Sequence, residues 1–252
     1  MAESWYRESF GAEYLTLYAH RDAAEAQANV GAVVELAELS RSDRILDLAC
    51  GAGRHLHALS EQGFDRVVGL DLSPALLSEA ALALDGATGR HAPLVRADMR
   101  HIPFIETFDA VLSLFTSFGY FSRGEEDARV LGEVSRVLRP GGVVVLDVMN
   151  RPRVLSRLVP CDLDQRGGLR ITNCRGLSDD GKRVIKDTEV RYPDGSVRRF
   201  RESVRLYTRD ELIALLHRAG FAKVRAFGSL EGELYTSDSP RLVLLALRGG
   251  AS

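Results

Sequence analysis

A short apolar stretch that runs into a glycine-rich turn constrains the fold of this chain more than any other feature. Residues 45–48, Ile-Leu-Asp-Leu, are typical of a buried strand, and the following Ala-Cys-Gly-Ala-Gly turn opens a predicted helix at about 54–61. This order of elements presents backbone N–H groups and the positive end of a helix to a ligand. Gly51 and Gly53 let the backbone approach that ligand closely, and a side chain at either position would fill its space. Asp47 lies near the end of the strand, so we expect its carboxylate to point at the same spot.

The next predicted strand ends in a second acid. A mostly apolar strand is expected at 66–70, and Asp71 follows it, 18 residues after Gly53. That spacing is close to the ~20 residues expected of a carboxylate that holds the hydroxyls of a ribose. A nicotinamide-dependent dehydrogenase would show the same acid, but it usually also carries G-x-G-x-x-G. Here the third glycine position holds Leu56 or Arg54, depending on where the count starts, so the pyrophosphate-binding turn is incomplete.

Together the two stretches, Asp-Leu-Ala-Cys-Gly-Ala-Gly and Gly-Leu-Asp-Leu-Ser, resemble motif I and the second acidic motif of class I S-adenosylmethionine-dependent methyltransferases. Ala49 is a mild departure, because the family often has glycine there. The resemblance covers residues 40–150 strongly and 206–248 moderately. It implies an α/β fold with a doubly wound, seven-stranded, mostly parallel sheet and an antiparallel last strand.

Four segments are expected along the chain. An N-terminal helical cap precedes the cofactor-binding core, and a small antiparallel β insertion after strand 5 separates that core from the C-terminal part of the sheet. The insertion holds 14 Lys or Arg and 8 Asp or Glu, and its turns and alternating runs predict strands at about 169–176, 183–192 and 196–206. We expect it to cover the substrate or to form a homodimer surface; a face for an anionic partner and a solvated two-faced sheet are the alternatives. The segments are 1–39, 40–150, 151–205 and 206–252.

The N-terminal segment is dense in aromatic residues. It is either a helix packed on the core or a lid over the cofactor. As a lid it would set aromatic faces, with Tyr18 a candidate, near a sulfonium, and Arg21 near a carboxylate. In small-molecule enzymes of the resembling family this segment often covers the site, so both interpretations stay open.

A third acidic residue follows the end of a short strand predicted at 93–96. Asp98 lies two residues after its end, with Met99 as an apolar neighbour. This arrangement suits adenine recognition, since the carboxylate can accept from the exocyclic amine while Met99 offers its backbone N–H. The alternative is an exposed loop acid. The intervals from Asp47 and Asp71 favour the adenine role.

An aromatic loop, Phe-Thr-Ser-Phe-Gly-Tyr-Phe at 115–121, follows the strand predicted at 108–114. Open α/β sheets bind ligands at this end of their strands. The resemblance makes this loop motif IV, which lines the methyl-transfer position. The loop lacks the Asn/Asp-Pro-Pro-Tyr/Phe signature of enzymes that methylate amino groups of nucleic acids, which favours a small-molecule acceptor. An amine acceptor needs no general base; for a hydroxyl acceptor, Tyr120 and His101 are the nearest candidates.

Composition narrows the remaining possibilities. A net charge of −2 gives no general reason to expect a nucleic acid partner. No apolar run approaches the ~18 residues of a membrane span, and the N-terminus lacks a signal pattern, so we expect a cytoplasmic protein. The three cysteines share no metal-type spacing, and their odd number argues against a disulfide framework. No metal is expected.

The sequence therefore predicts S-adenosylmethionine-dependent methyl transfer to a small-molecule acceptor. The glycine turn would take the methionine end of the cofactor, Asp71 its ribose, and Leu72 would pack on the base, while Leu114 and Phe115 flank the methyl group. A nicotinamide-dependent oxidoreductase and a non-catalytic protein that binds S-adenosylmethionine or RNA are the alternatives. The expected cofactor-binding residues are Tyr18, Arg21, Asp47, Ala49, Gly51, Gly53, Asp71, Leu72, Asp98, Met99, Leu114 and Phe115.

Overall fold

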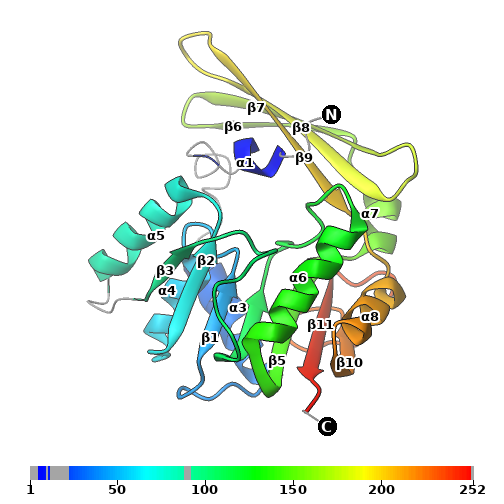
Figure 1. The fold of residues 1–252 in the computed structure, drawn as a ribbon. Coiled ribbons are helices and arrows are strands. Elements are labelled where there is room, and N and C mark those ends of the chain that lie inside the picture. The colour runs from blue at the N-terminus through cyan, green and yellow to red at the C-terminus, as the bar shows by residue number, and fades with distance from the viewer. Residues whose placement is uncertain (1–4, 10, 12–22, 88–91, 251–252) are drawn as a thin grey trace.

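Seven strands form the main sheet of the computed structural model, which describes residues 5–9, 11, 23–87 and 92–250. Their order is β10-β11-β5-β4-β1-β2-β3 (Figure 1). Every neighbouring pair is parallel except those that involve β11, which runs antiparallel to both β5 and β10. This confirms the expected α/β fold with its antiparallel last strand. The strands are β1 (Ile45–Leu48), β2 (Val67–Asp71), β3 (Leu94–Arg96), β4 (Phe108–Ser113), β5 (Leu138–Met149), β10 (Phe221–Phe227) and β11 (Arg241–Arg248).

Helices cover both faces of this sheet, because successive strand side chains point to opposite sides. Ile45 belongs to a buried cluster with side chains of α3, α4 and α5, whereas Leu46 belongs to a second cluster with those of α6 and α8. Both side chains are fully buried, which stabilises the fold by roughly 1.5–3 kcal/mol each. The helices are α3 (Ala23–Leu36), α4 (Arg54–Glu61), α5 (Pro74–Ala87), α6 (Gly124–Val137) and α8 (Arg209–Arg218).

The insertion is a second, four-stranded antiparallel sheet in the order β6-β7-β8-β9. It lies above the carboxyl ends of the parallel strands, with α1 (Trp5–Ser9) between the two sheets (Figure 1). The three strands expected from the alternating runs are confirmed, but the prediction missed a fourth strand and the helix that precedes it. The missed elements are α7 (Arg151–Arg157) and β6 (Cys161–Arg166), and the expected strands are β7 (Leu169–Leu177), β8 (Arg183–Arg191) and β9 (Val197–Arg205).

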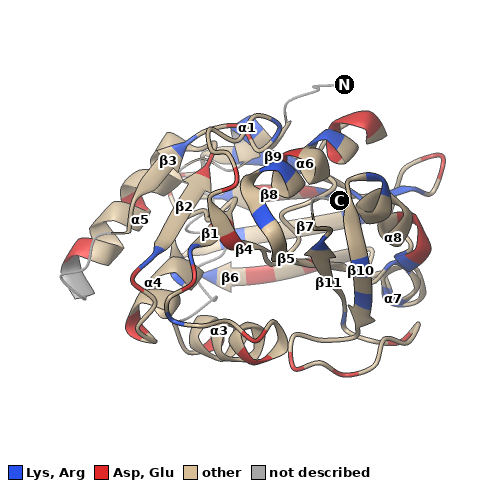
Figure 2. Cartoon of the chain, turned by 60° about the horizontal axis from the view of Figure 1, so that its bottom comes forward, with Lys and Arg blue, Asp and Glu red and all other residues tan. Residues whose placement is uncertain are grey.

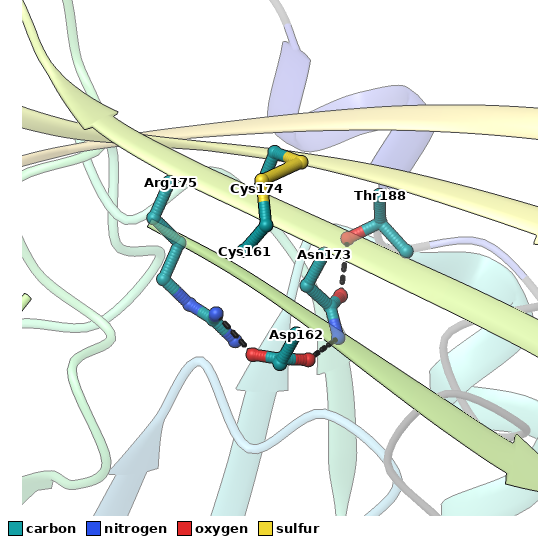
Figure 3. The surroundings of a disulfide bond; sticks show 6 residues. All are labelled: Cys161, Asp162, Asn173, Cys174, Arg175 and Thr188. Carbon is teal, nitrogen blue, oxygen red and sulfur yellow. Dashed lines mark hydrogen bonds and ion pairs between the residues drawn. A yellow bond between two sulfur atoms is a disulfide. The ribbon is translucent and has the colours of Figure 1, made fainter. Parts of the chain in front are cut away.

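The cysteines correct a second expectation, because Cys161 and Cys174 form a disulfide. The odd number of cysteines was a poor guide: these two lie directly opposite each other in the β6–β7 register, with Cα atoms 4.2 Å apart, while Cys50 stays buried and free. Figure 3 shows a hydrogen-bonded row, Asp162, Asn173 and Thr188, that lies beside the disulfide. Since neighbouring strand residues face opposite ways, this row occupies the other face of the sheet.

Strand β5 begins with the Leu-Arg-Pro-Gly-Gly stretch at 138–142, and its Leu138 pairs with Phe108 of β4. Helix α5 includes Gly86 and ends at Ala87. Within the described residues, no helix is long and apolar enough to span a membrane.

Basic positions mark β8 and β9, and acidic ones mark β6 (Figure 2). Many of these charges pair within the insertion: Lys186 Nζ lies 3.3 Å from Glu202 Oε1, and Arg199 Nη2 lies 2.9 Å from Glu189 Oε2. The first pair is partly buried and the second is largely exposed, and exposed pairs contribute little to stability. Each pair joins one positive and one negative charge, so the insertion keeps a surplus of six positive charges, 14 basic minus 8 acidic residues.

Candidate functional site

A cavity of about 550 Å³ opens at the carboxyl ends of β1, β2, β3 and β4, and its size is that of a small-molecule site. Its wall combines the glycine turn, the loops after β2 and β3, the aromatic loop and the cap helix α1. Most of the residues predicted to bind a cofactor meet here. Those in the wall are Ala49, Gly51, Asp71, Leu72, Asp98, Met99, Leu114 and Phe115.

The glycine turn follows β1 in a left-handed conformation, with φ of +57° at Gly51 and +77° at Gly53. A Cβ on Gly51 would meet nothing closer than Leu76 Cδ1 at 3.9 Å, so it would project into the cavity. A Cβ on Gly53 would instead lie 2.9 Å from Cβ of Ala80 in α5. Of the two glycines, only Gly51 lines the cavity and has open space where a side chain would be. Gly53 is required for the close approach of α4 and α5.

Asp71 joins the glycine turn to the loop after β2. One carboxylate oxygen accepts from the backbone N–H of Gly51 at 2.9 Å, and the other accepts from that of Ser73 at 2.8 Å. Burial raises the pKa of Asp71, and these hydrogen bonds oppose the change. The backbone of Leu72 also hydrogen-bonds to Asp71, and a carboxylate has about four acceptor sites, so acceptor capacity remains for a ligand hydroxyl.

Asp47 is a buried acid beneath the turn, with 2% of its surface exposed. Its Oδ2 has no hydrogen-bond partner among the described residues. Burial, reinforced by the charge of Asp71 and opposed by that of Arg54, raises the pKa of Asp47 from 3.8 to about 7. An uncompensated carboxylate in this position is a ready partner for a cationic group.

Arg54, the first residue of α4, is a site residue that the sequence analysis missed. It lines the cavity, its Nη1 pairs with Glu25 at 2.9 Å, and its guanidinium lies 4.9 Å from the ring centroid of Phe115. Its Nη2 is buried and has no hydrogen-bond partner in the described part of the chain. A free N–H and, on Asp47, a free carboxylate oxygen therefore lie around one glycine turn. The signal was present in the sequence as a basic residue directly after the second glycine.

Asp98 lines the cavity but is already engaged by Arg100. The guanidinium donates to both carboxylate oxygens, at 3.0 Å to Oδ1 and 2.6 Å to Oδ2, and the backbone N–H of Arg100 donates to Oδ1 at 2.9 Å. Burial acts to raise the pKa of Asp98, but these hydrogen bonds outweigh it and hold the pKa below its ordinary value. Oδ2 keeps an acceptor site for a further donor.

The aromatic loop begins with two strained residues, since Phe115 and Thr116 have φ of +59° and +62°. Such conformations cost about 1–3 kcal/mol each in residues other than glycine. Asp147 of β5 compensates: its Oδ2 accepts from the N–H of Phe115 at 2.8 Å, and its Oδ1 accepts from Arg241 Nε at 2.6 Å. Arg241 Nη2 also donates to Thr116 Oγ1 at 2.7 Å. The sequence signal for this interaction was Asp147 itself, an acid between the apolar residues Leu146 and Val148 of β5.

The two candidates for a general base, Tyr120 and His101, lie in different places. Tyr120 lines the cavity, and its ring packs edge-on against Trp5 with centroids 5.3 Å apart. His101 is exposed, with Nε2 2.6 Å from Arg129 Nη2, and it is not part of the cavity wall. The structure therefore does not bring His101 together with the other candidates in the cavity wall. Tyr18 and Arg21 lie outside the described residues.

Comparison with known proteins adds independent evidence. A family model described as a methyltransferase domain matches residues 45–142. The dTDP-3-amino-3,4,6-trideoxy-alpha-D-glucopyranose N,N-dimethyltransferase of Streptomyces venezuelae is 30% identical over 193 residues, which are 74% of this chain and 77% of the relative.

Two solved structures share the fold. A S-adenosylmethionine-dependent methyltransferase from Clostridium acetobutylicum superimposes with a TM-score of 0.79 at 18% identity, covering 94% of this chain and 96% of the other. The structure of an amino pentose methyltransferase from Micromonospora echinaspora, solved with S-adenosylmethionine bound, has a TM-score of 0.64 at 27% identity, with coverage of 93% and 96%.

Proposed function

Because the chain belongs to the class I S-adenosylmethionine-dependent methyltransferases, we propose that it methylates the nitrogen of an amino sugar. Two relatives support this acceptor: one is named as an amino-sugar N,N-dimethyltransferase and the other as an amino pentose methyltransferase. The aromatic loop fits this acceptor, since Tyr120 and Ser117 are its polar side chains in the cavity wall. An amine that loses its proton to solvent needs no general base.

The residues around the cavity fit the cofactor. Asp47 is proposed to pair with the ammonium group of its amino-acid tail, and Arg54 with the carboxylate. Asp71 would accept from the ribose hydroxyls through its remaining acceptor sites. Two of these roles use buried atoms that have no hydrogen-bond partner among the described residues, Asp47 Oδ2 and Arg54 Nη2.

The other end of the cofactor has its own proposed contacts. Asp98 would accept from the adenine amine through Oδ2, Met99 would offer its backbone N–H, and Leu72 would pack against the base. Leu114 and Phe115 would flank the methyl group.

When bound, the cofactor would supply both the methyl group and, in its sulfonium sulfur, the leaving group. The protein then has to orient the acceptor and exclude water, and orientation is worth roughly 7–11 kcal/mol in favourable cases. The rigid backbone of the aromatic loop, held by Asp147, is suited to this task. The insertion and the N-terminal segment, residues 1–39, are proposed to act as the cover that closes the site.

The observation that carries the proposal is the cavity that the glycine turn and the aromatic loop share. The direct test is to incubate the protein with S-adenosylmethionine and a dTDP-3-amino sugar, and to follow the sugar by mass spectrometry. We expect a gain of one or two methyl groups. The matched control is the same nucleotide sugar with a hydroxyl in place of the amine, which should stay unchanged. Methylation of the hydroxyl compound, or of neither, would reject the amine acceptor.

Asp71→Asn is expected to weaken the binding of S-adenosylhomocysteine by about 1–3 kcal/mol. The amide has one acceptor oxygen instead of two and no charge, so it cannot satisfy Gly51, Ser73 and a ribose diol together. Isothermal titration calorimetry measures the affinity. Asp210→Asn, at a side chain 80% exposed on α8, serves as the control. An affinity equal to that of the wild type would remove Asp71 from the ribose site.

A homodimer formed through the insertion stays a prediction. Sedimentation velocity of the purified protein would test it, and a monomer at all concentrations would exclude it.

A further inference from the structure

We propose that Arg183 of the insertion is a positioning residue for methyl transfer, which fixes the acceptor half of the aromatic loop against the cavity. The inference rests on the proposed function, because it gives the insertion a part in the reaction beyond that of a cover.

The side chain of Arg183, at the start of β8, reaches three consecutive carbonyl groups of the loop. Its guanidinium donates to the carbonyl oxygens of Phe121 at 2.8 Å, Tyr120 at 3.1 Å and Gly119 at 3.2 Å. The same guanidinium is fixed within the insertion, since Nε donates to Ser203 Oγ at 2.8 Å and Nη2 donates to Ser203 O at 2.6 Å. One side chain therefore ties two strands of the insertion to the loop.

The backbone supports this link at the same place. The N–H of Arg205 in β9 donates to the carbonyl of Gly119 at 2.8 Å. Gly119 has φ of +90°, and a Cβ there would lie 3.0 Å from the carbonyl oxygen of Arg205. The loop can approach β9 this closely only with glycine at this position. The insertion and the loop therefore meet along a tight backbone contact that Arg183 completes.

The three carbonyls belong to the part of the loop that faces the acceptor. Tyr120 and Phe121 both line the cavity. The carbonyl of Tyr120 also accepts from Trp5 Nε1 at 3.2 Å, and the Phe121 ring packs edge-on against Tyr6 with centroids 5.5 Å apart. The loop is thus fixed at Phe115 by the core sheet and at its other end by Arg183. A displacement of about 1 Å at such a position can lower the rate about 100-fold.

Arginine suits this role better than lysine. A guanidinium presents five N–H donors in a planar fork, whereas an ammonium presents three from a single point. Arg183→Lys should therefore keep part of the effect, and Arg183→Gln should lose most of it. Arg199→Gln is the matched control, because Arg199 lies in the same sheet with its side chain 77% exposed and pairs with Glu189.

The test has three measurements. Trp5 is the single tryptophan of the chain and shares the Tyr120 carbonyl with Arg183, so its fluorescence reports the position of the loop. We expect Arg183→Gln to shift the Trp5 emission and to lower kcat on a dTDP-3-amino sugar about 30- to 100-fold. The affinity for S-adenosylhomocysteine should stay within about twofold, because the strand ends hold the cofactor. Arg183→Lys should fall between, and Arg199→Gln should match the wild type.

Two results would overturn the inference. One is a folded Arg183→Gln protein whose Trp5 emission and kcat equal those of the wild type. The other is a loss of S-adenosylhomocysteine affinity as large as the loss of kcat, which would indicate general disruption of the structure. If the wild type methylates no amino sugar, the proposed acceptor fails, while the fluorescence and the cofactor affinity still decide the role of Arg183.

Discussion

Gly51→Val abolishes cofactor binding and leaves the fold intact: this is the result we expect. The β-branched side chain would project into the cavity, where a Cβ meets nothing closer than Leu76 Cδ1 at 3.9 Å. It would also sit at a φ of +57°, which valine tolerates poorly. We expect the affinity for S-adenosylhomocysteine to fall more than about 100-fold, or roughly 3 kcal/mol. Calorimetry measures the affinity, and circular dichroism the fold.

Gly141→Val is the control that separates backbone strain from filling of the cavity. Gly141 has φ of +80°, and a Cβ added there would have nothing within 4 Å. It lies near the start of β5, at the end of the sheet opposite the cavity. The two variants therefore share the backbone penalty, but only one fills the cavity. Gly141→Val should lower the melting temperature and still bind cofactor. If Gly51→Val also binds it, the turn does not face the ligand.

Asp47→Asn is expected to make the cofactor-free protein more stable at pH 8 and to weaken cofactor binding. In the folded protein, burial raises the pKa of Asp47 from 3.8 to about 7. Between these two pH values the unfolded chain has released a proton that the folded chain retains, so the stability of the wild type falls as pH rises from about 4 to 7. Above pH 7 the loss is complete, and below pH 4 it is absent.

Asparagine removes this ionisation. Since a tenfold difference in proton affinity corresponds to about 1.4 kcal/mol, Asp47→Asn should be more stable than the wild type by on the order of 2–4 kcal/mol at pH 8. The advantage should disappear near pH 4. Urea unfolding of the cofactor-free protein at several pH values measures the difference in unfolding free energy between the variant and the wild type, both at pH 8 and near pH 4. A variant that is less stable than the wild type at pH 8 would mean that Asp47 has a compensating partner.

The proposed effect of Asp47 on cofactor binding is tested by the pH dependence of the affinity. A cationic group beside Asp47 returns its pKa toward the ordinary range, so binding below pH 7 should release close to one proton. The affinity of the wild type should therefore increase as pH rises toward 7, by up to about tenfold for each pH unit. Calorimetry in buffers of different ionisation enthalpy counts the proton. Adenosine, which lacks the amino-acid tail, should show no such dependence, and equal behaviour of the two ligands would contradict the proposed pairing.

The sequence was sufficient to predict what each strand end offers. The buried strand before Gly51 and the acids at Asp47 and Asp71 are local patterns, and parallel strands bring their carboxyl ends to one edge of a sheet. The family resemblance that these residues carry implied the correct sheet and most of the residues in the cavity wall. It could not show that Asp71 bonds directly to the turn containing Gly51, because that contact depends on the register of β1 and β2.

Most of the missed features are contacts between residues far apart in the chain. Asp147 and Arg241 are 94 residues apart, and their pairing follows from the antiparallel register of β5 and β11. The disulfide was missed for a different reason: Cys161 and Cys174 are only 13 residues apart, but strand β6 was not predicted, so its register with β7 could not be known. Arg183 gave no signal either: it is one of many basic residues in the insertion, and only the folded chain shows which one reaches the loop.

The insertion leaves the core after β5 and rejoins it just before α8, so two chain crossings connect it to the rest of the molecule. The residues proposed to hold the cofactor all come from other elements. In evolution, residues 151–205 could therefore be replaced as a unit, which would change the acceptor and leave the cofactor site unaltered. The replacement segment would need to bring an arginine at the position of Arg183, together with a strand that can lie against Gly119.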